Sequence, residues 1–367
     1  MATVPLIAPS EDFRRELRRR GGERASRCYQ CATCSAVCEL APEGRPFPRR
    51  QVLLAQWGQG DQLATDPAVW LCHQCNDCTV RCPRDVRPGD LMQVVRAMVI
   101  ERLAAPAFLG RLVANVRSTW PVVLGAPLLL WVLLLGLTGH LGVPPGFHAY
   151  DQLVPHWLIY SVFFPVAAFV LWAAWVSGRR FWTLLGSVGP PRKGSFLASL
   201  VPVFGEISTH GRFSNCEAGR PRRWGHLALL WGFVGAAVTS GLLVVALYGF
   251  GAQLPLPLDH PFKILGNISA VLLVVGGVIL LINRLGDPQK TGASTAFDRF
   301  FLTVVLLVIA TGVLAEVGRF FFPAAVACSI YIVHLSVVLT LFVTFPYSKF
   351  AHMLYRTLAM VHERMTG

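Results

Sequence analysis

The chain has 367 residues, of which 54% are hydrophobic and only 14% charged, and its mean hydropathy is +0.52. This composition excludes an ordinary pair of soluble domains, so part of the chain must lie in lipid. The formal net charge of +13 comes largely from segments that flank apolar runs. Because no nucleic-acid-binding module is visible, we read this charge as a topology signal and expect no nucleic acid partner.

The first 110 residues are predicted to form a soluble head. Eight of the ten cysteines lie before residue 83, and the charged N-terminal segment lacks the apolar run of a secretory signal. We therefore expect a reducing, cytoplasmic environment, in which thiols bind metal or carry out redox chemistry instead of forming structural disulfides. The other two cysteines, Cys216 and Cys328, stand alone and are expected to have no functional role.

Two blocks of four cysteines share the spacing C-x2-C-x2-C-x3-C, and Pro83 follows the second block. This spacing is typical of two [4Fe-4S] clusters, in which three cysteines of one block and the fourth of the other bind each cluster. The predicted ligands of cluster I are Cys28, Cys31, Cys34 and Cys82. The predicted ligands of cluster II are Cys72, Cys75, Cys78 and Cys38. Zinc also accepts four thiolates, but its sites usually combine two separate C-x2-C pairs, so clusters are favoured.

Six apolar stretches are long enough to cross a bilayer as helices, which takes about 20 residues. They are approximately Pro121–Thr138, His156–Val176, Trp224–Phe250, Lys263–Asn283, Phe300–Phe320 and Ala324–Phe345. The predicted fold is therefore mainly α. It comprises an α-helical ferredoxin-like head with two clusters at 1–110, a linker at 111–120 and a six-helix membrane domain at 121–367.

Basic residues indicate which side of the membrane each loop occupies. The connector Ser177–Arg223 and the loop Arg284–Arg299 are rich in basic residues, whereas Gly139–Pro155 contains no Lys or Arg. By the positive-inside rule, we expect a multi-pass protein of the cytoplasmic membrane, with the head and both termini in the cytoplasm.

Histidines in the predicted spans are candidate ligands of haem b, because an unpartnered histidine is costly in lipid. His226 begins the third span and His334 lies in the sixth. If the sixth span continues past Pro346, His334 and His352 leave one helical face five turns apart, so that each could serve a haem near one membrane surface. His226 and His352 are expected at the same depth near the cytoplasm. For each of the three, the alternative is a buried histidine bonded to a helix carbonyl.

Two other histidines are open to interpretation. His210, in the cytoplasmic connector, could cover a haem edge, contact the head or be a solvated loop residue. His260, in an outer loop, lies where a proton-exchanging role near quinone is conceivable, although a lone loop histidine is weak evidence.

The head resembles the C subunit of heterodisulfide reductase, a small ferredoxin-like electron carrier. The stretches from His226 to Ala236 and from His334 to His352 resemble the ligand helices of the gamma subunit of respiratory nitrate reductase. This second resemblance implies that His226 and His352 bind the haem nearer the cytoplasm and that His334 binds a distal haem. Ala236 stands where the family has the distal partner, so either another histidine replaces it, with His156 and His148 as candidates, or His334 is structural.

Together the two halves resemble the C subunit of the quinone-interacting membrane-bound oxidoreductase complex of sulfur-metabolising prokaryotes. This resemblance implies the quinone-interacting subunit of an oxidoreductase complex, which passes electrons between menaquinone or another quinone, haem b and the two clusters. It also implies soluble flavin and iron–sulfur partners resembling the A subunit of heterodisulfide reductase, and a link to adenylylsulfate reductase. No catalytic residue is assigned. The alternatives are the equivalent subunit of a heterodisulfide reductase or sulfite-reduction complex, and a redox-sensing membrane anchor without haem.

Overall fold

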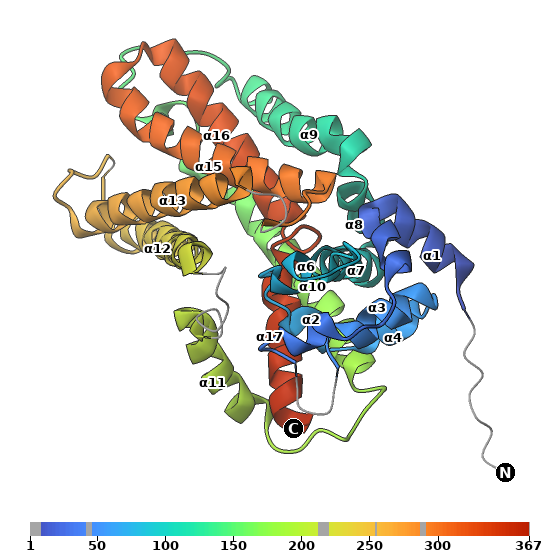
Figure 1. Ribbon diagram of the computed structural model, residues 1–367. Helices are drawn as coiled ribbons and strands as arrows, with labels where there is room; N and C mark the ends of the chain where they lie inside the picture. Colours follow the sequence, from blue (N-terminus) through green and yellow to red (C-terminus); the bar gives the residue numbers. More distant parts are fainter. Residues whose placement is uncertain (1–8, 42–45, 212–219, 254, 287–290, 367) are drawn as a thin grey trace.

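The computed structural model describes residues 9–41, 46–211, 220–253, 255–286 and 291–366. These residues form helices, turns and loops, with no strand among them, so the predicted mainly α fold is confirmed. Figure 1 shows the short helices of the head gathered beside α17 and α10, with the long apolar helices extending away from them.

The head consists of short helices packed around one longer helix, α7 (Pro88–Leu103). Leu91, Met92 and Val95 of α7 are buried in the core of the head. The other α-helices of the head are α1 (Glu11–Leu17), α2 (Thr33–Ala36), α3 (Arg49–Gln56), α4 (Gly60–Thr65), α5 (Ala68–Leu71) and α6 (Asp77–Val80). Because α2 and α6 have only four residues each, their positions depend on this shared core more than on helix propensity.

Six helices are long and apolar enough to cross a membrane, as predicted. They are α9 (Val116–Leu137), α10 (His156–Leu185), α12 (Arg220–Phe250), α13 (Pro261–Leu285), α15 (Ala296–Phe321) and α16 (Ala324–Thr344). The predicted linker at 111–120 is helical, since it comprises the end of α8 (Ala107–Ala114) and the start of α9. Apolar side chains such as Leu171, Val271 and Phe342 remain exposed on these helices, which is the surface expected against lipid.

The sixth span does not continue to His352, so the expectation of one long helix with His334 and His352 on the same face is wrong. The chain leaves helical geometry after Thr344 and begins a new helix, α17 (Ala351–Thr366). Pro346, in the intervening turns, cannot donate the backbone hydrogen bond that a continuous helix would require. Long-range contacts hold the break: the Tyr347 hydroxyl donates to the Ala105 carbonyl at 2.7 Å, and Lys349 pairs with Asp298 at 2.8 Å.

The head packs directly on α10 and α17. The ring of Trp70, from α5, stacks on Tyr355 of α17 with ring centres 4.8 Å apart and meets the edge of Phe181 of α10 at 5.5 Å. All three rings belong to the hydrophobic cluster that also forms the core of the head. The two cysteine blocks are therefore held in a defined position relative to the membrane helices.

One further helix, α11 (Phe196–Thr209), lies in the connector between α10 and α12. It packs against α17 through Val203, which shares a cluster with Met360 and Val361. His210 follows α11 directly, with a left-handed backbone that ends the helix. The packing of α11 therefore positions His210.

Candidate functional site

The two cysteine blocks fold into nearly the same loop twice. The residue before the second cysteine and the residue after it have positive φ in both blocks, at Gln30 and Ala32 in the first and at Gln74 and Asn76 in the second. A short helix follows each time, α2 after the first pair and α6 after the second. These left-handed residues turn the backbone around a point, so three thiols can face one centre.

Backbone N–H groups also point toward the cysteine sulfurs. Gln30 donates to Cys28 Sγ at 3.4 Å, and Gln74 donates to Cys72 Sγ at the equivalent distance of 3.3 Å. Val86 donates to Cys82 Sγ at 3.4 Å. Such bonds to sulfur ligands are among the features that set the reduction potential of an iron–sulfur cluster.

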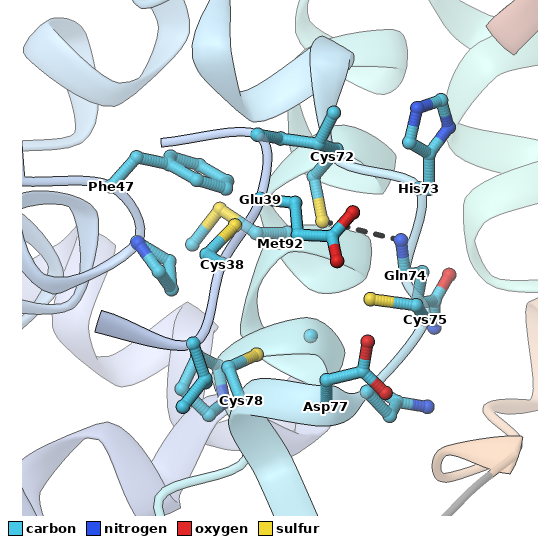
Figure 2. A pocket seen from close by; sticks show the side chains of 16 residues that line it. Cys38, Glu39, Phe47, Cys72, His73, Gln74, Cys75, Asp77, Cys78 and Met92 are labelled. Carbon is cyan, nitrogen blue, oxygen red and sulfur yellow. Dashed lines mark hydrogen bonds between the residues drawn. The ribbon is translucent and has the colours of Figure 1, made fainter. Parts of the chain in front are cut away.

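The thiols surround two hollows, and each hollow draws on both blocks. One is lined by Cys72, Cys75, Cys78 and Cys38, with Phe47 and Met92 closing it (Figure 2). The other is lined by Cys28, Cys31, Cys34 and Cys82. We call these the cluster II hollow and the cluster I hollow. The structure thus brings together the crossed sets of four cysteines that the spacing predicts.

The arrangement suits a cubane cluster better than a single ion. In a [4Fe-4S] cluster each thiolate binds a different iron, so the four sulfurs need a wider spacing than the tetrahedral site of zinc. Four thiols that line a hollow fit this requirement.

Burial disfavours the thiolate form of several of these cysteines. It raises the pKa of Cys34 and Cys78, and it raises the pKa of Cys38 to about 11. Exposed Cys31 differs, because a hydrogen bond with Thr33 lowers the pKa of its thiol. Since thiolates bind iron, loading these sites must release protons, and cluster assembly should be less favourable in acid.

Arginines from two membrane-domain helices reach the loop of cluster II. Arg356 of α17 donates to the Leu71 carbonyl at 3.4 Å and contacts a ring nitrogen of His73 at 2.6 Å. Arg222 of α12 donates to the Gln74 carbonyl at 2.8 Å. From within the head, Arg96 donates to the Val69 carbonyl at 2.7 Å. The loop beside Cys72 is therefore tied to the membrane domain and bordered by positive charge.

The two membrane-domain arginines each lie one helical turn from a predicted haem ligand. Arg222 precedes His226 by four residues on α12, and Arg356 follows His352 by four residues on α17. The ring centres of His226 and His352 are 6.0 Å apart, with the planes perpendicular. Two imidazoles that bind one metal at about 2 Å each have ring centres roughly 6 Å apart. The two imidazoles, although they lie on separate helices, are therefore close enough that both would be able to hold one iron, such as that of a haem.

His210 forms a hydrogen bond with the Nδ1 atom of His226. The Nδ1 of His210 lies 2.6 Å from the Ile207 carbonyl, which can only accept, so Nδ1 carries the proton. Burial lowers the pKa of His210, which keeps the ring neutral and leaves its Nε2 as an acceptor. Nε2 lies 3.2 Å from His226 Nδ1, so His226 must donate there. The Nε2 of His226 is then unprotonated, which is the state in which an imidazole nitrogen can bind a metal.

The same reasoning applies to His352 and His334. His352 Nδ1 donates to the Lys349 carbonyl, and burial lowers the pKa of His352 to about 4, so its Nε2 is also unprotonated. His334 Nδ1 lies 3.0 Å from Thr311 Oγ1, whose hydroxyl donates to the Leu307 carbonyl at 2.6 Å. His334 therefore donates to Thr311, and its Nε2 is free of that bond.

The other candidates make local contacts. His156 stacks on Tyr160 at the start of α10, His148 Nδ1 contacts the Gly146 carbonyl at 3.1 Å, and His260 accepts from the Phe262 backbone N–H as the N-cap of α13. Cys328 is buried in an apolar cluster of α16, and Cys216 lies outside the described residues. The contact between His210 and His226 could not be found from the sequence, because sixteen positions and a helix boundary separate them.

Comparison with known proteins identifies both halves of the chain. Residues 121–366 match the family model for citrate utilization protein B, and residues 24–86 match that of a 4Fe-4S dicluster domain. The chain belongs to the citrate utilization protein B family. It is 28% identical to citrate utilization protein B of Escherichia coli over 350 residues, which cover 91% of this chain and 88% of that protein. No solved structure is significantly similar to it.

The head also has relatives among heterodisulfide reductases. It is 36% identical over 89 residues to the C subunit of the H2:CoB-CoM heterodisulfide,ferredoxin reductase of Methanothermobacter thermautotrophicus, covering 23% of this chain and 46% of that protein. It is 38% identical over 85 residues to a heterodisulfide reductase C-subunit-like protein of Archaeoglobus profundus, covering 23% of this chain and 45% of that protein. The predicted resemblance of the head is thus confirmed, and the chain is an iron–sulfur, membrane-embedded relative of oxidoreductase subunits.

Proposed function

We propose that this protein is the quinone-interacting membrane subunit of an oxidoreductase complex, which relays electrons between the quinone pool and a soluble partner. The observation that carries this proposal is that the loop of cluster II is hydrogen-bonded to the helices that carry the histidine pair. Arg222 and Arg356 hydrogen-bond the loop of cluster II, and each lies one turn from a member of the pair His226 and His352. A haem site and a cluster site in adjoining positions are what an electron relay requires.

Each predicted ligand has a role in this proposal. Cys28, Cys31, Cys34 and Cys82 hold cluster I, and Cys72, Cys75, Cys78 and Cys38 hold cluster II. His226 and His352 hold haem b, which when bound would accept and release single electrons within the membrane. His210 fixes the tautomer of His226. His334, with its Nδ1 bonded to Thr311, is the candidate ligand of a second haem.

The orientation of the chain is part of the proposal. The head, α11 and α17 pack together, and we place them in the cytoplasm because the connector that carries α11 is rich in basic residues. A reporter fused after Gly367 should therefore read cytoplasmic, and one inserted near Pro145 should read external. Reversed signals would put the clusters on the wrong side for a cytoplasmic partner.

The identity of the soluble partner has two candidates. Flavin and iron–sulfur proteins resembling the A subunit of heterodisulfide reductase, linked to adenylylsulfate reductase, are implied by the resemblance of the two halves together to the C subunit of the quinone-interacting membrane-bound oxidoreductase complex. A redox enzyme of citrate utilization is favoured by a different observation, the similarity to citrate utilization protein B over 91% of this chain, against 23% for the heterodisulfide reductase relatives. Purification of the complex from its source, with identification of the co-purifying flavoprotein, distinguishes them.

Cofactor content and reaction with quinone test the relay itself. The purified protein should contain about eight irons, eight sulfides and at least one haem b per chain. After reduction of the clusters with light and deazaflavin, a menaquinone analogue should reoxidise them. A protein with clusters but without haem would instead support the redox-sensing anchor.

A further inference from the structure

The loop of cluster I differs from that of cluster II in its exposure. Cys31 is exposed, and the neighbouring Tyr29 has 72% of its surface accessible. In the second block His73, the residue equivalent to Tyr29, is only 3% exposed. Cluster I is therefore the cluster whose edge lies at the protein surface.

Arginines surround this exposed edge. The segments 23–34 and 81–87, which carry the cysteines of the cluster I hollow, contain five arginines and only two acidic residues. The acidic residues are Glu23 and Asp85, and the arginines are Arg24, Arg27, Arg81, Arg84 and Arg87. We call these five arginines the arginine rim.

One carboxylate neutralises only part of the rim. Asp85 pairs with Arg24, with Arg87 at 3.0 Å and with Arg27 at 4.0 Å, so three guanidinium groups share a single negative charge. Arg84 lies over the Tyr29 ring at 4.2 Å and donates to its hydroxyl at 3.1 Å, which holds that ring in place at the surface. Arg81 is exposed. The result is a positively charged surface with an aromatic ring held against one of its arginines.

The segments that carry the cysteines of cluster II differ from those of cluster I in having acidic residues and no basic ones. Glu39 and Asp77 line its hollow together with the cysteines, and the segments 38–41 and 72–80 contain no arginine or lysine (Figure 2). Its arginines come from α12, α17 and α7, and they are bonded to backbone carbonyls. Within the part of the chain that the structure describes, neither Arg27 nor Arg81 bonds a backbone carbonyl in this way, so their charge remains available to a partner.

We propose that the arginine rim is the docking surface for an acidic, soluble redox protein that exchanges single electrons with cluster I. This inference rests on the proposed function, because it concerns the soluble partner of the relay. It states that this partner docks at the arginine rim and that its docking surface is negatively charged. Complementary charge raises the rate of productive encounter, and charged residues at the edge of an interface act mainly on that rate. In the transfer, one electron leaves the partner and enters the oxidised cluster, with no bond formed or broken.

The test uses the full-length protein in detergent and reduced flavodoxin, a small acidic flavoprotein, as the probe. Stopped-flow absorbance gives the second-order rate constant for cluster reduction at low and high salt. The unmodified protein should lose at least about tenfold in rate as salt rises. The variant Arg27→Glu/Arg81→Glu should be about tenfold slower at low salt and nearly insensitive to salt.

Two controls make the result specific. Arg15→Glu/Arg19→Glu reverses two exposed arginines near the N-terminal end of the head and should react like the unmodified protein. Reduction by photoreduced deazaflavin should reach the same extent in every variant, which shows that both clusters are present. If the first variant loses a cluster, Arg27→Gln/Arg81→Gln replaces it.

Unchanged kinetics in a rim variant with both clusters, or equal slowing in the control variant, would overturn the docking surface. The proposed relay is judged separately, by reoxidation of the clusters with a menaquinone analogue in the same preparations. Reoxidation should be identical in the rim variants and the unmodified protein. If the menaquinone analogue does not reoxidise the clusters of the unmodified protein, the proposed relay is contradicted. The flavodoxin kinetics would still decide whether the arginine rim is a docking surface.

Discussion

The two cysteine blocks have the same spacing and the same backbone turns, but they lie in different surroundings. The first block has its second cysteine exposed beside the arginine rim. The second block is covered by the membrane domain, with Arg222 and Arg356 bonded to its loop carbonyls. The two copies of the motif thus differ in what they can contact. The first block is accessible to a soluble partner, and the second block faces the membrane domain. The difference arises from residues within the motif, such as Tyr29 in the first block and His73 in the second, and from the contacts that the membrane domain makes with the second block.

The largest expected effect comes from substituting the fourth cysteine of either block with serine. Cys82→Ser should disrupt cluster I, and Cys38→Ser should disrupt cluster II, because each thiol lines the hollow formed by the other block. Electron paramagnetic resonance of the reduced variants, with iron quantified, distinguishes the two signals. If Cys82→Ser removed only the cluster bound by Cys72, Cys75 and Cys78, the crossed assignment would be wrong.

Loss of haem should follow from either member of the histidine pair. His226→Ala and His352→Ala should each remove the haem nearer the head while both clusters remain, since the rings lie 6.0 Å apart and the cysteine sites are separate. Haem and iron per chain are the measurements. His334→Ala counts haems: loss of a second signal identifies His334 as a ligand, and no loss identifies a one-haem protein. Retention of all haem in the first two variants contradicts the ligand assignment.

A smaller effect is expected at His210. His210→Ala removes the acceptor of the His226 Nδ1 proton, and loss of such a supporting contact typically costs about 10–100-fold in metal affinity. The haem should be bound more weakly and its spectrum shifted, with the clusters unaffected. His140→Ala is a matched control, because that ring contacts Thr138, two residues away, and has no assigned part in haem binding. Equal haem retention in both variants would show that His210 does not support haem binding.

The smallest effect concerns the connection between head and membrane domain. Arg356→Gln should weaken that connection by about 1–3 kcal/mol, because the buried Leu71 carbonyl loses a charged donor. Removal of the positive charge should also lower the reduction potential of cluster II, since the reduced cluster carries more negative charge. Redox titration and thermal unfolding are the measurements, with Arg27→Gln as the matched control for cluster I. A shift confined to cluster I would reverse the assignment of the two blocks.

Local patterns predicted the cysteine sets and the six spans, because ligand spacing and apolar length depend on residues close in sequence. The predicted sixth span ended at Phe345, close to the observed end of α16 at Thr344, but a kinked continuation past Pro346 was expected to keep His334 and His352 on one face. The break that separates α17 from α16 rules this out. It depends on Tyr347 reaching Ala105 and Lys349 reaching Asp298, contacts that cross much of the chain. The contact of His210 with His226 likewise requires α11 to pack on α17. Sequence spacing therefore predicted which cysteines lie together, whereas tertiary packing determines the contacts that surround them.

In the proposed relay, electrons pass between the clusters and quinone by way of the site formed by His226 and His352. The most direct measurement starts with clusters reduced by light and deazaflavin and follows their reoxidation after a menaquinone analogue is added. The unmodified protein should reoxidise rapidly, and His226→Ala protein that retains both clusters should be slower by at least about tenfold, equivalent to about 1.4 kcal/mol in barrier height. Equal rates in the two proteins would show that the histidine pair is not on the route between the clusters and quinone.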